Sequence, residues 1–275
     1  MSDVFLAQLE DELLGVTSRP SLLQRIAALR VPVRSIPKIL LNIGARGIAG
    51  SVRRRFINPR SLYEEGRVLP PCGMTMIGRK RLRNVRFCIE QILQNGIPGD
   101  LIETGVWRGG AAIYMRAVLK NHGVEDRTVW VADSFQGLPS PDPRYRADAK
   151  DILHYRSNLA VSQKEVESHF LAFGLLDDRI RFFPGWFEDS LKTFPKTTLA
   201  LLRIDCDLYR STITVLTELY GRVAKGGYVI VDDYGEIPGC RLAVEDFRRI
   251  RKICDPIIEI DHTGIYWIKT ATAEN

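Results

Sequence analysis

The sequence lacks any hydrophobic run long enough to cross a membrane. No apolar stretch in its 275 residues approaches the roughly 18 to 20 residues of a membrane-spanning helix. The acidic start Met1-Ser2-Asp3 also lacks the basic region of a signal peptide, so we expect a cytoplasmic protein. No Cys-x-x-Cys pair occurs among the five cysteines, which disfavours a zinc or redox site and predicts free thiols.

Acidic residues are missing from one long segment. From Arg19 to Arg60 the sequence holds ten Lys or Arg residues and no Asp or Glu, so the total charge of +6 leaves −4 for the rest of the chain. Such a segment would attract nucleic acid or an anionic membrane, but it lacks aromatic side chains interleaved for base stacking. We therefore expect it to cover a substrate site or to pack between subunits of a homo-oligomer, with neither nucleic acid nor membrane as a partner.

Hydrophobic patterning divides the chain into a short helical appendage, residues 1–66, and one larger domain, residues 67–275. In the larger domain a helix is predicted over 78–94. The predicted strands, with helical segments between them, cover 101–104, 128–132, 179–183, 199–204 and 228–231. Two further β-runs, 257–260 and 265–269, are joined by a short turn. The pattern predicts an α/β fold whose parallel sheet is covered on both faces and finished by an antiparallel pair.

A glycine turn follows the first strand of this pattern. Its residues are Glu103-Thr104-Gly105-Val106-Trp107-Arg108-Gly109-Gly110. The Gly-x-x-x-Gly-Gly spacing differs from the Gly-x-Gly-x-x-Gly of a dinucleotide site, and Glu103 suits a cationic ligand better than a pyrophosphate. Glycine lets the backbone approach a ligand at the carboxyl end of the sheet, so we expect a binding site here, but not one for NAD.

The ends of the next two strands are typical of a nucleoside site. Asp133 ends the second strand, where an acidic side chain accepts the two hydroxyls of a ribose. Gly185-Trp186-Phe187 follows the third strand, and its rings are placed to wall an adenine, although core packing explains two aromatic residues almost as well. With the glycine turn, these residues predict an adenosine-type ligand.

Acidic residues end the fourth and fifth strands. Asp205-Cys206-Asp207 closes the fourth strand and Asp232-Asp233 closes the fifth. Neighbouring parallel strands lie under about 5 Å apart, so these carboxylates converge and repel one another unless a cation lies between them. Hard oxygen ligands favour Mg²⁺ over Ca²⁺ or Mn²⁺, and no Cys/His set competes for zinc. We predict a Mg²⁺ site at Asp205, Asp232 and Asp233; the alternative is that these acids are solvated in loops.

At these motifs the sequence resembles the macrocin O-methyltransferase family, over roughly residues 62–269. The matching motifs are Thr75-Met76-Ile77-Gly78, Glu103-Thr104-Gly105-Val106-Trp107, Asp133-Ser134-Phe135-Gln136-Gly137, Gly185-Trp186-Phe187, Asp205-Cys206-Asp207-Leu208-Tyr209 and Asp232-Asp233-Tyr234. One departure is Cys206, where the family pattern leads us to expect glycine. Known members methylate sugar hydroxyls of macrolide and aminocoumarin antibiotics.

The resemblance implies a class I, Rossmann-like methyltransferase fold: a seven-stranded, mostly parallel sheet with an antiparallel last strand. It implies S-adenosylmethionine and Mg²⁺ as cofactors, and a glycosylated small molecule as acceptor in the biosynthesis of an antibiotic or other secondary metabolite. The residues that it assigns to the S-adenosylmethionine site are Thr75, Met76, Glu103, Thr104, Gly105, Val106, Trp107, Asp133, Ser134, Gly185, Trp186 and Phe187.

The chemistry of methyl transfer requires a base. The reaction is an in-line displacement at a sulfonium methyl, so the acceptor oxygen must be aligned and must lose its proton. Chelation of two adjacent hydroxyls by Mg²⁺ would lower the pKa of one of them. Candidate bases are Asp205, in the predicted metal cluster, and His154, in the insertion after Asp133. For His154, an ordinary loop histidine is an equal alternative.

Two other functions stay open at this point. A nicotinamide-dependent oxidoreductase would share the doubly wound sheet, but it needs a dinucleotide turn that the sequence does not show. A noncatalytic, methyltransferase-like nucleic-acid-binding module would explain the basic segment, but it would not need the paired acidic strand ends.

Overall fold

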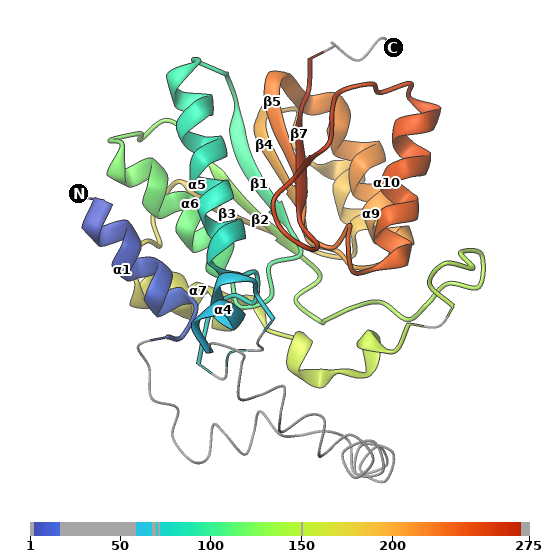
Figure 1. The fold of residues 1–275 in the computed structure, drawn as a ribbon, viewed down its shortest axis with the longest axis horizontal. Helices are drawn as coiled ribbons and strands as arrows, with labels where there is room; N and C mark the ends of the chain where they lie inside the picture. Colours follow the sequence, from blue (N-terminus) through green and yellow to red (C-terminus); the bar gives the residue numbers. More distant parts are fainter. Residues whose placement is uncertain (1–2, 17–58, 68–69, 71, 150, 271–275) are drawn as a thin grey trace, which may run out of the picture.

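The computed structural model describes residues 3–16, 59–67, 70, 72–149 and 151–270, and its centre is one seven-stranded sheet (Figure 1). The strands are β1 (Asp100–Thr104), β2 (Val129–Asp133), β3 (Ile180–Pro184), β4 (Leu199–Ile204), β5 (Val223–Val231), β6 (Ile258–Glu259) and β7 (Ile265–Ile268). Their order is β3-β2-β1-β4-β5-β7-β6. The first five run parallel, and β7 is antiparallel to both β5 and β6. The predicted parallel sheet finished by an antiparallel pair is confirmed.

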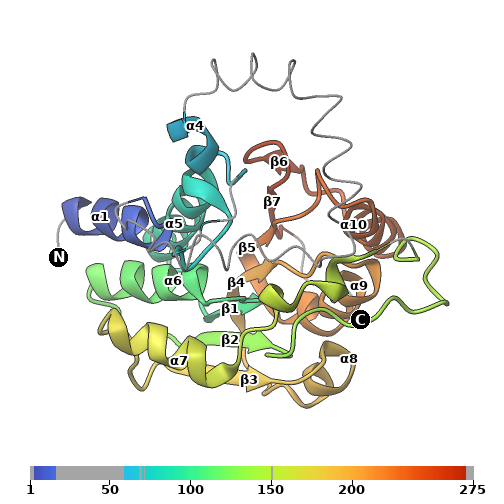
Figure 2. The same cartoon turned by 90° about the horizontal axis from the view of Figure 1, so that it is seen from below.

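Helices cover both faces of the sheet (Figure 2). One face carries α1 (Asp3–Leu13), α5 (Gly78–Gln94), α6 (Gly110–Asn121) and α7 (Gln163–Ala172). The opposite face carries α8 (Phe187–Ser190), α9 (Tyr209–Leu219) and α10 (Pro238–Ile250). The shorter elements are α4 (Pro59–Glu64) and the 3₁₀ helices η2 (Leu153–Tyr155), η3 (Ser157–Leu159), η4 (Leu191–Thr193) and η5 (Tyr220–Arg222). Each face of the sheet therefore has its own hydrophobic cluster.

The central strands and α5 show how the sequence pattern leads to this fold. All six residues of β4 are buried, as expected of a strand covered on both faces. On α5, Leu82, Val85, Ile89 and Ile92 recur at helical spacing and are buried in the cluster of that face. The helix predicted over 78–94 is thus confirmed.

The fifth strand begins well before its predicted start, whereas the bounds of the other strands lie within one residue of those predicted. The sequence places the start of the fifth strand at residue 228, whereas β5 begins at Val223. Two glycines, Gly226 and Gly227, interrupt the β-pattern, and Gly226 has a φ of +83°. Pairing with β4 shifts register in the same region, between Leu199 and Leu201. Because glycine carries no side chain, hydrophobic alternation cannot reveal a strand that passes through such an irregularity.

The described part of the N-terminal appendage packs onto the larger domain. On α1, Leu6, Leu9 and Leu13 are buried in the same hydrophobic cluster as α5 and α6. Glu10 is 3% exposed and accepts a hydrogen bond from the Tyr114 hydroxyl at 2.6 Å. These contacts fix α1 against α6.

Apart from its last two residues, the basic segment 19–60 lies outside the described residues. Within the described ranges, no helix combines the length and the apolar character needed to span a membrane.

Candidate active site

A pocket opens at the carboxyl edge of the sheet, where the turns after β1, β2, β3 and β4 meet. It encloses about 690 Å³ between atoms, part of it open to solvent. The residues that line it are Met76, Gly105, Trp107, Asp133, Ser134, Gly137, Leu138, Pro139, Leu159, Gly185, Trp186, Phe187, Glu188, Asp205, Cys206, Asp207 and Ser211. This edge is where open parallel sheets bind their ligands.

The glycine turn after β1 lies directly against the end of β4. Gly105 has a φ of +81°, and a Cβ atom added to it would lie 1.8 Å from the backbone oxygen of Asp205. Only glycine fits this close approach of two chains. The turn therefore brings the predicted cofactor and metal residues to one edge.

Asp133, at the end of β2, is held by backbone amides. Its Oδ2 accepts a hydrogen bond from the N–H of Val106 at 2.7 Å, and its Oδ1 accepts one from the N–H of Phe135 at 2.7 Å. Burial raises the pKa of this carboxyl group, and the hydrogen bonds oppose that shift. Oδ1 also accepts a longer hydrogen bond, 3.4 Å, from the Ser134 hydroxyl. The carboxylate is therefore fixed in place, and Oδ2 keeps a lone pair that can accept a hydrogen bond from a ligand.

Glu103 lies behind the glycine turn and is 2% exposed. Its Oε1 accepts a hydrogen bond from Arg203 at 2.6 Å, whereas its buried Oε2 accepts none from the described residues. Burial raises the pKa of Glu103 to about 8; Arg203 opposes this shift, whereas the charges of Asp205 and Asp232 add to it. An unsatisfied buried acceptor is costly, which adds to the cost of ionising Glu103.

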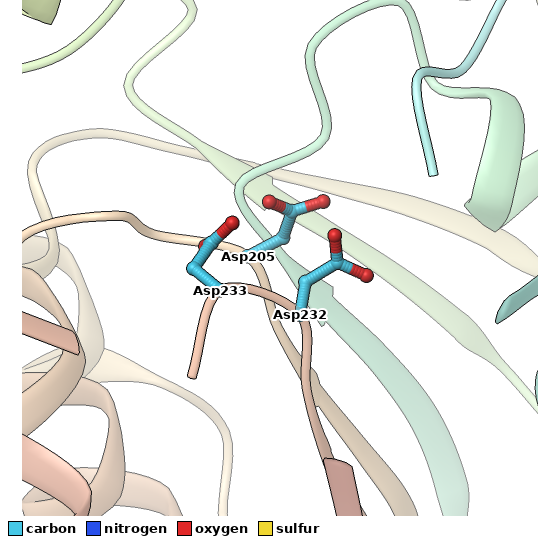
Figure 3. Close-up of side chains that lie close together, drawn as sticks. All are labelled: Asp205, Asp232 and Asp233. Carbon is cyan, nitrogen blue, oxygen red and sulfur yellow. The ribbon is translucent and has the colours of Figure 1, made fainter. Parts of the chain in front are cut away.

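Asp205, Asp232 and Asp233 converge on one point beyond β4 and β5 (Figure 3). One carboxylate oxygen of each lies within 4.8 Å of those of the other two. The Asp205 side chain keeps 27% of its surface exposed, yet desolvation and the charge of Asp232 raise its pKa to about 6. Desolvation also raises the pKa of Asp233 well above its usual value, with Asp207 and Asp205 adding to the shift. The three carboxylates are thus in the mutual repulsion that a divalent cation relieves.

Two buried arginines partly neutralise this cluster. Arg203 donates to Glu103 and, at 2.9 Å, to Oδ2 of Asp205. Asp232 accepts from Arg203 through Oδ1 and from Arg81, on α5, through Oδ2. Both oxygens of Asp232 therefore already have a cationic partner. The acidic side chains around the two guanidinium groups outnumber them; they are Glu103, Asp205, Asp207, Asp232, Asp233 and Asp261.

The comparison with protein families decides what kind of protein carries this site. A family model described as macrocin-O-methyltransferase (TylF) matches residues 14–269. The chain belongs to the macrocin O-methyltransferase family. It is an O-methyltransferase, as the motifs at its strand ends predicted.

Individual relatives support this assignment. Demethyldecarbamoylnovobiocin O-methyltransferase of Streptomyces niveus is 49% identical to the chain over 245 residues, 84% of this chain and 94% of that protein. Mycinamicin III 3''-O-methyltransferase of Micromonospora griseorubida is 49% identical over 212 residues, 76% of this chain and 83% of that protein.

Solved structures agree. The O-methyltransferase NovP superposes with a TM-score of 0.82 at 43% identity and covers 98% of this chain and 100% of its own. CalS11, a calicheamicin methyltransferase, shares the fold at a TM-score of 0.57 and 19% identity, covering 93% of this chain and 96% of its own. The predicted class I methyltransferase fold is confirmed.

Within this O-methyltransferase, the predicted site residues differ in their position relative to the pocket. Those of the predicted cofactor set that line the pocket are Met76, Gly105, Trp107, Asp133, Ser134, Gly185, Trp186 and Phe187. Those that lie behind its wall are Thr75, Glu103, Thr104 and Val106. His154, in η2, is outside the lining, and its Nδ1 lies 3.3 Å from Oδ2 of Asp151. Of the predicted metal residues, Asp205 lines the pocket, and Asp232 and Asp233 lie beside it.

The sequence-based list omitted Asp207. This residue lines the pocket, has a φ of +57°, and donates its N–H to Oδ2 of Asp233 at 3.1 Å. Desolvation and the charge of Asp205 raise its pKa to about 7. The signal was present, because Asp207 belongs to the same motif as Asp205. A positive φ at a residue other than glycine is uncommon and marks a conformation held by its surroundings.

Proposed function

We propose that the chain is an S-adenosylmethionine-dependent O-methyltransferase that uses a divalent metal, Mg²⁺, to methylate a sugar hydroxyl of a glycosylated natural product in antibiotic or secondary-metabolite biosynthesis. The observation that carries the proposal is one pocket lined by both Asp133 and Asp205, with the acidic cluster at its side. A nucleoside site and a carboxylate site that share one opening are what metal-assisted methyl transfer requires.

The residues of the first half of the pocket fit S-adenosylmethionine. Asp133 offers two fixed oxygens to a ribose, and Trp186 and Phe187 offer ring surface to an adenine. Behind the turn, the buried Oε2 of Glu103 accepts no hydrogen bond from the described residues. The sulfonium cofactor carries an ammonium group and a positive sulfur, which suit the acidic character of this half.

The donor set of the second half fits Mg²⁺. Asp205, Asp232 and Asp233 would hold the ion through carboxylate oxygens, the ligand type that Mg²⁺ prefers, and the pocket leaves room for water and acceptor oxygens. When bound, the ion would lower the pKa of a coordinated sugar hydroxyl. Arg81 and Arg203 hold Asp232 in place, and Arg203 also holds Asp205, so the carboxylates are positioned before any ion arrives.

A base must take the proton of the acceptor hydroxyl. Asp205 and His154 are the bases expected from the sequence, and we add Asp207. Asp207 lines the pocket, and its pKa of about 7 suits a group that gains and loses a proton near neutrality. Substituting Asp205, Asp207 and His154 one at a time by Asn or, for His154, by Gln, and comparing the pH dependence of kcat, would identify the base.

The relatives indicate the acceptor class. The names of the relatives from Streptomyces niveus and Micromonospora griseorubida specify antibiotic substrates, novobiocin-type and mycinamicin. We therefore propose a glycosylated small molecule as acceptor, with the basic segment 19–60 covering the acceptor or joining subunits of a homo-oligomer.

The test is a panel of glycosylated acceptors incubated with enzyme, S-adenosylmethionine and Mg²⁺, with products read by mass spectrometry. The expected product gains one methyl group, located by fragmentation on the sugar. Methylation confined to the aglycone or to RNA would contradict the proposal, as would calorimetric binding of NADH in preference to S-adenosylmethionine.

A further inference from the structure

The chain between β2 and α7, residues 134–149 and 151–161, forms one wall of the pocket. We call it the pocket loop. Its lining residues are Ser134, Gly137, Leu138, Pro139 and Leu159. The pocket is also lined by Asp205 to Asp207 and by Ser211, in the first turn of α9. The shape of the pocket near the acidic cluster therefore depends on how the pocket loop is held against α9.

Asp148 is the point at which the pocket loop enters the protein interior. It is 2% exposed, whereas Ala147 and Ala149 on either side of it are exposed. Its Oδ1 accepts a hydrogen bond from the N–H of Tyr209 at 2.7 Å, and its Oδ2 accepts one from the N–H of Arg210 at 3.1 Å. Burying a carboxylate is unfavourable unless it is hydrogen-bonded, and here both oxygens have a donor.

These two amides belong to the first turn of α9. The residue at the start of that helix, Leu208, provides no side-chain cap. The Asp148 carboxylate, 61 residues before Tyr209 in the chain, accepts the hydrogen bonds of these amides instead. A carboxylate at a helix N-terminus satisfies amides that lack a partner within the helix and interacts favourably with the helix dipole. Because Asp205 to Leu208 lead directly into α9, the same contact also restrains the segment that carries Asp207.

The start of α10 closes the site around Asp148. A Cβ atom added to Gly239 would lie 2.6 Å from Oδ1 of Asp148 and 3.1 Å from the backbone nitrogen of Tyr209. The carboxylate is thus enclosed by the pocket loop, α9 and α10. The other links between loop and helix lie nearer the surface, such as the ion pair of Arg210 with Asp142 at 3.3 Å, and such pairs contribute little.

We propose that Asp148 is a positioning residue, which latches the pocket loop onto α9 and so holds the acceptor side of the pocket opposite the acidic cluster. It does not contact the reacting atoms. Its effect on turnover rests on the proposed function, whereas its effect on the loop does not.

The experiment compares wild type with Asp148→Ala and Asp148→Asn in three measurements. Limited trypsin digestion should cut at Arg144 and Arg146 about tenfold faster in Asp148→Ala, because the exposed loop has lost its buried anchor. KM for the acceptor should rise by about the same factor, while calorimetric affinity for S-adenosylmethionine changes less than about twofold. Asp148→Asn keeps one acceptor oxygen, so its digestion rate and its KM for the acceptor should fall between those of wild type and Asp148→Ala.

A second variant and a control keep the test decisive if Asp148→Ala folds poorly. Gly239→Ala leaves the carboxylate in the chain but pushes on it from α10, and it should speed digestion of the loop in the same way. Asp178→Asn removes one negative charge from an exposed position before β3 and should behave as wild type in all three measurements.

The latch is refuted if Asp148→Ala and Gly239→Ala leave both the digestion rate and the acceptor KM at wild-type values. It is also refuted if affinity for S-adenosylmethionine falls as much as acceptor affinity, because that pattern indicates general destabilisation. Failure of the wild type to methylate any glycosylated acceptor would count against the proposed function, and the digestion rates would still decide the role of Asp148.

Discussion

The carboxylates in the two halves of the carboxyl edge of the sheet are surrounded by different groups. At the end of β2, Asp133 is surrounded by peptide amides, which donate to both of its oxygens. At the ends of β4 and β5, Asp205 and Asp233 face other carboxylates, and desolvation and mutual repulsion raise their pKa values. Asp133 satisfies its charge with backbone dipoles, whereas Asp205 and Asp233 leave part of their charge unsatisfied.

This difference fits the two ligands that we propose. A carboxylate fixed by amides is ready to accept hydrogen bonds from neutral hydroxyls, and binding requires no rearrangement. Carboxylates that repel one another destabilise the protein until a cation joins them, which is how stability is often lost at functional sites. The predictions below test this contrast, from the largest expected effect to the smallest.

Arg203 stabilises the acidic half by pairing with three of its carboxylates. Arg203→Met should lower the free energy of unfolding by about 3 to 5 kcal/mol, because it leaves Glu103, Asp205 and Asp232 without their shared counter-charge. The measurement is urea unfolding of the metal-free protein. The matched control is Arg210→Met, which removes a partly exposed guanidinium and should cost no more than about 1 kcal/mol. Equal losses in the two variants would show that the buried network contributes nothing special.

Asp133 tests the amide-bound half. Asp133→Ala should weaken S-adenosylmethionine binding by about 1 to 3 kcal/mol, because it removes charge-assisted hydrogen bonds to the ribose. Calorimetry with S-adenosylmethionine and, separately, with Mg²⁺ provides the check, and affinity for Mg²⁺ should stay within about twofold of wild type. Unchanged cofactor affinity would remove Asp133 from the cofactor site.

Asp233 tests the acidic half, where we expect substitution to affect Mg²⁺ binding. In the metal-free protein, at a pH at which the Asp233 carboxyl group is ionised, Asp233→Asn should raise the free energy of unfolding by about 1 kcal/mol, since the variant removes a repelled charge and keeps an oxygen that can accept from the N–H of Asp207. The same variant should lose affinity for Mg²⁺ and lose turnover. Unfolding in EDTA and calorimetry with Mg²⁺ measure the two effects. If Asp233→Asn is less stable than wild type in EDTA and still binds Mg²⁺ normally, repulsion among these carboxylates does not destabilise the protein.

Most of the fold was predictable because its signals are local. The α5 bounds follow from apolar spacing and a glycine stop, and the acidic strand ends follow from parallel pairing, which brings Thr104, Ile204 and Val231 level with one another. The start of β5 was not predictable, because Gly226 and Gly227 carry no pattern.

The partners of the site residues were harder to predict. Arg203 lies in an otherwise apolar strand, and a charge at such a position indicates a buried partner. The sequence alone does not identify Asp232 as that partner. Arg81 and Asp148 reach the site from 151 and 61 residues away, distances over which a single sequence gives no pairing information. Their roles depend on tertiary packing.

The most direct test of the whole account is methyl transfer to a glycosylated acceptor by enzyme stripped of divalent ions. With EDTA in excess, we expect S-adenosylmethionine to bind with unchanged affinity by calorimetry and methyl transfer to stop; adding Mg²⁺ beyond the chelator should restore it. Full turnover in excess EDTA would contradict the account, because the acidic half of the edge would then have no cation to hold.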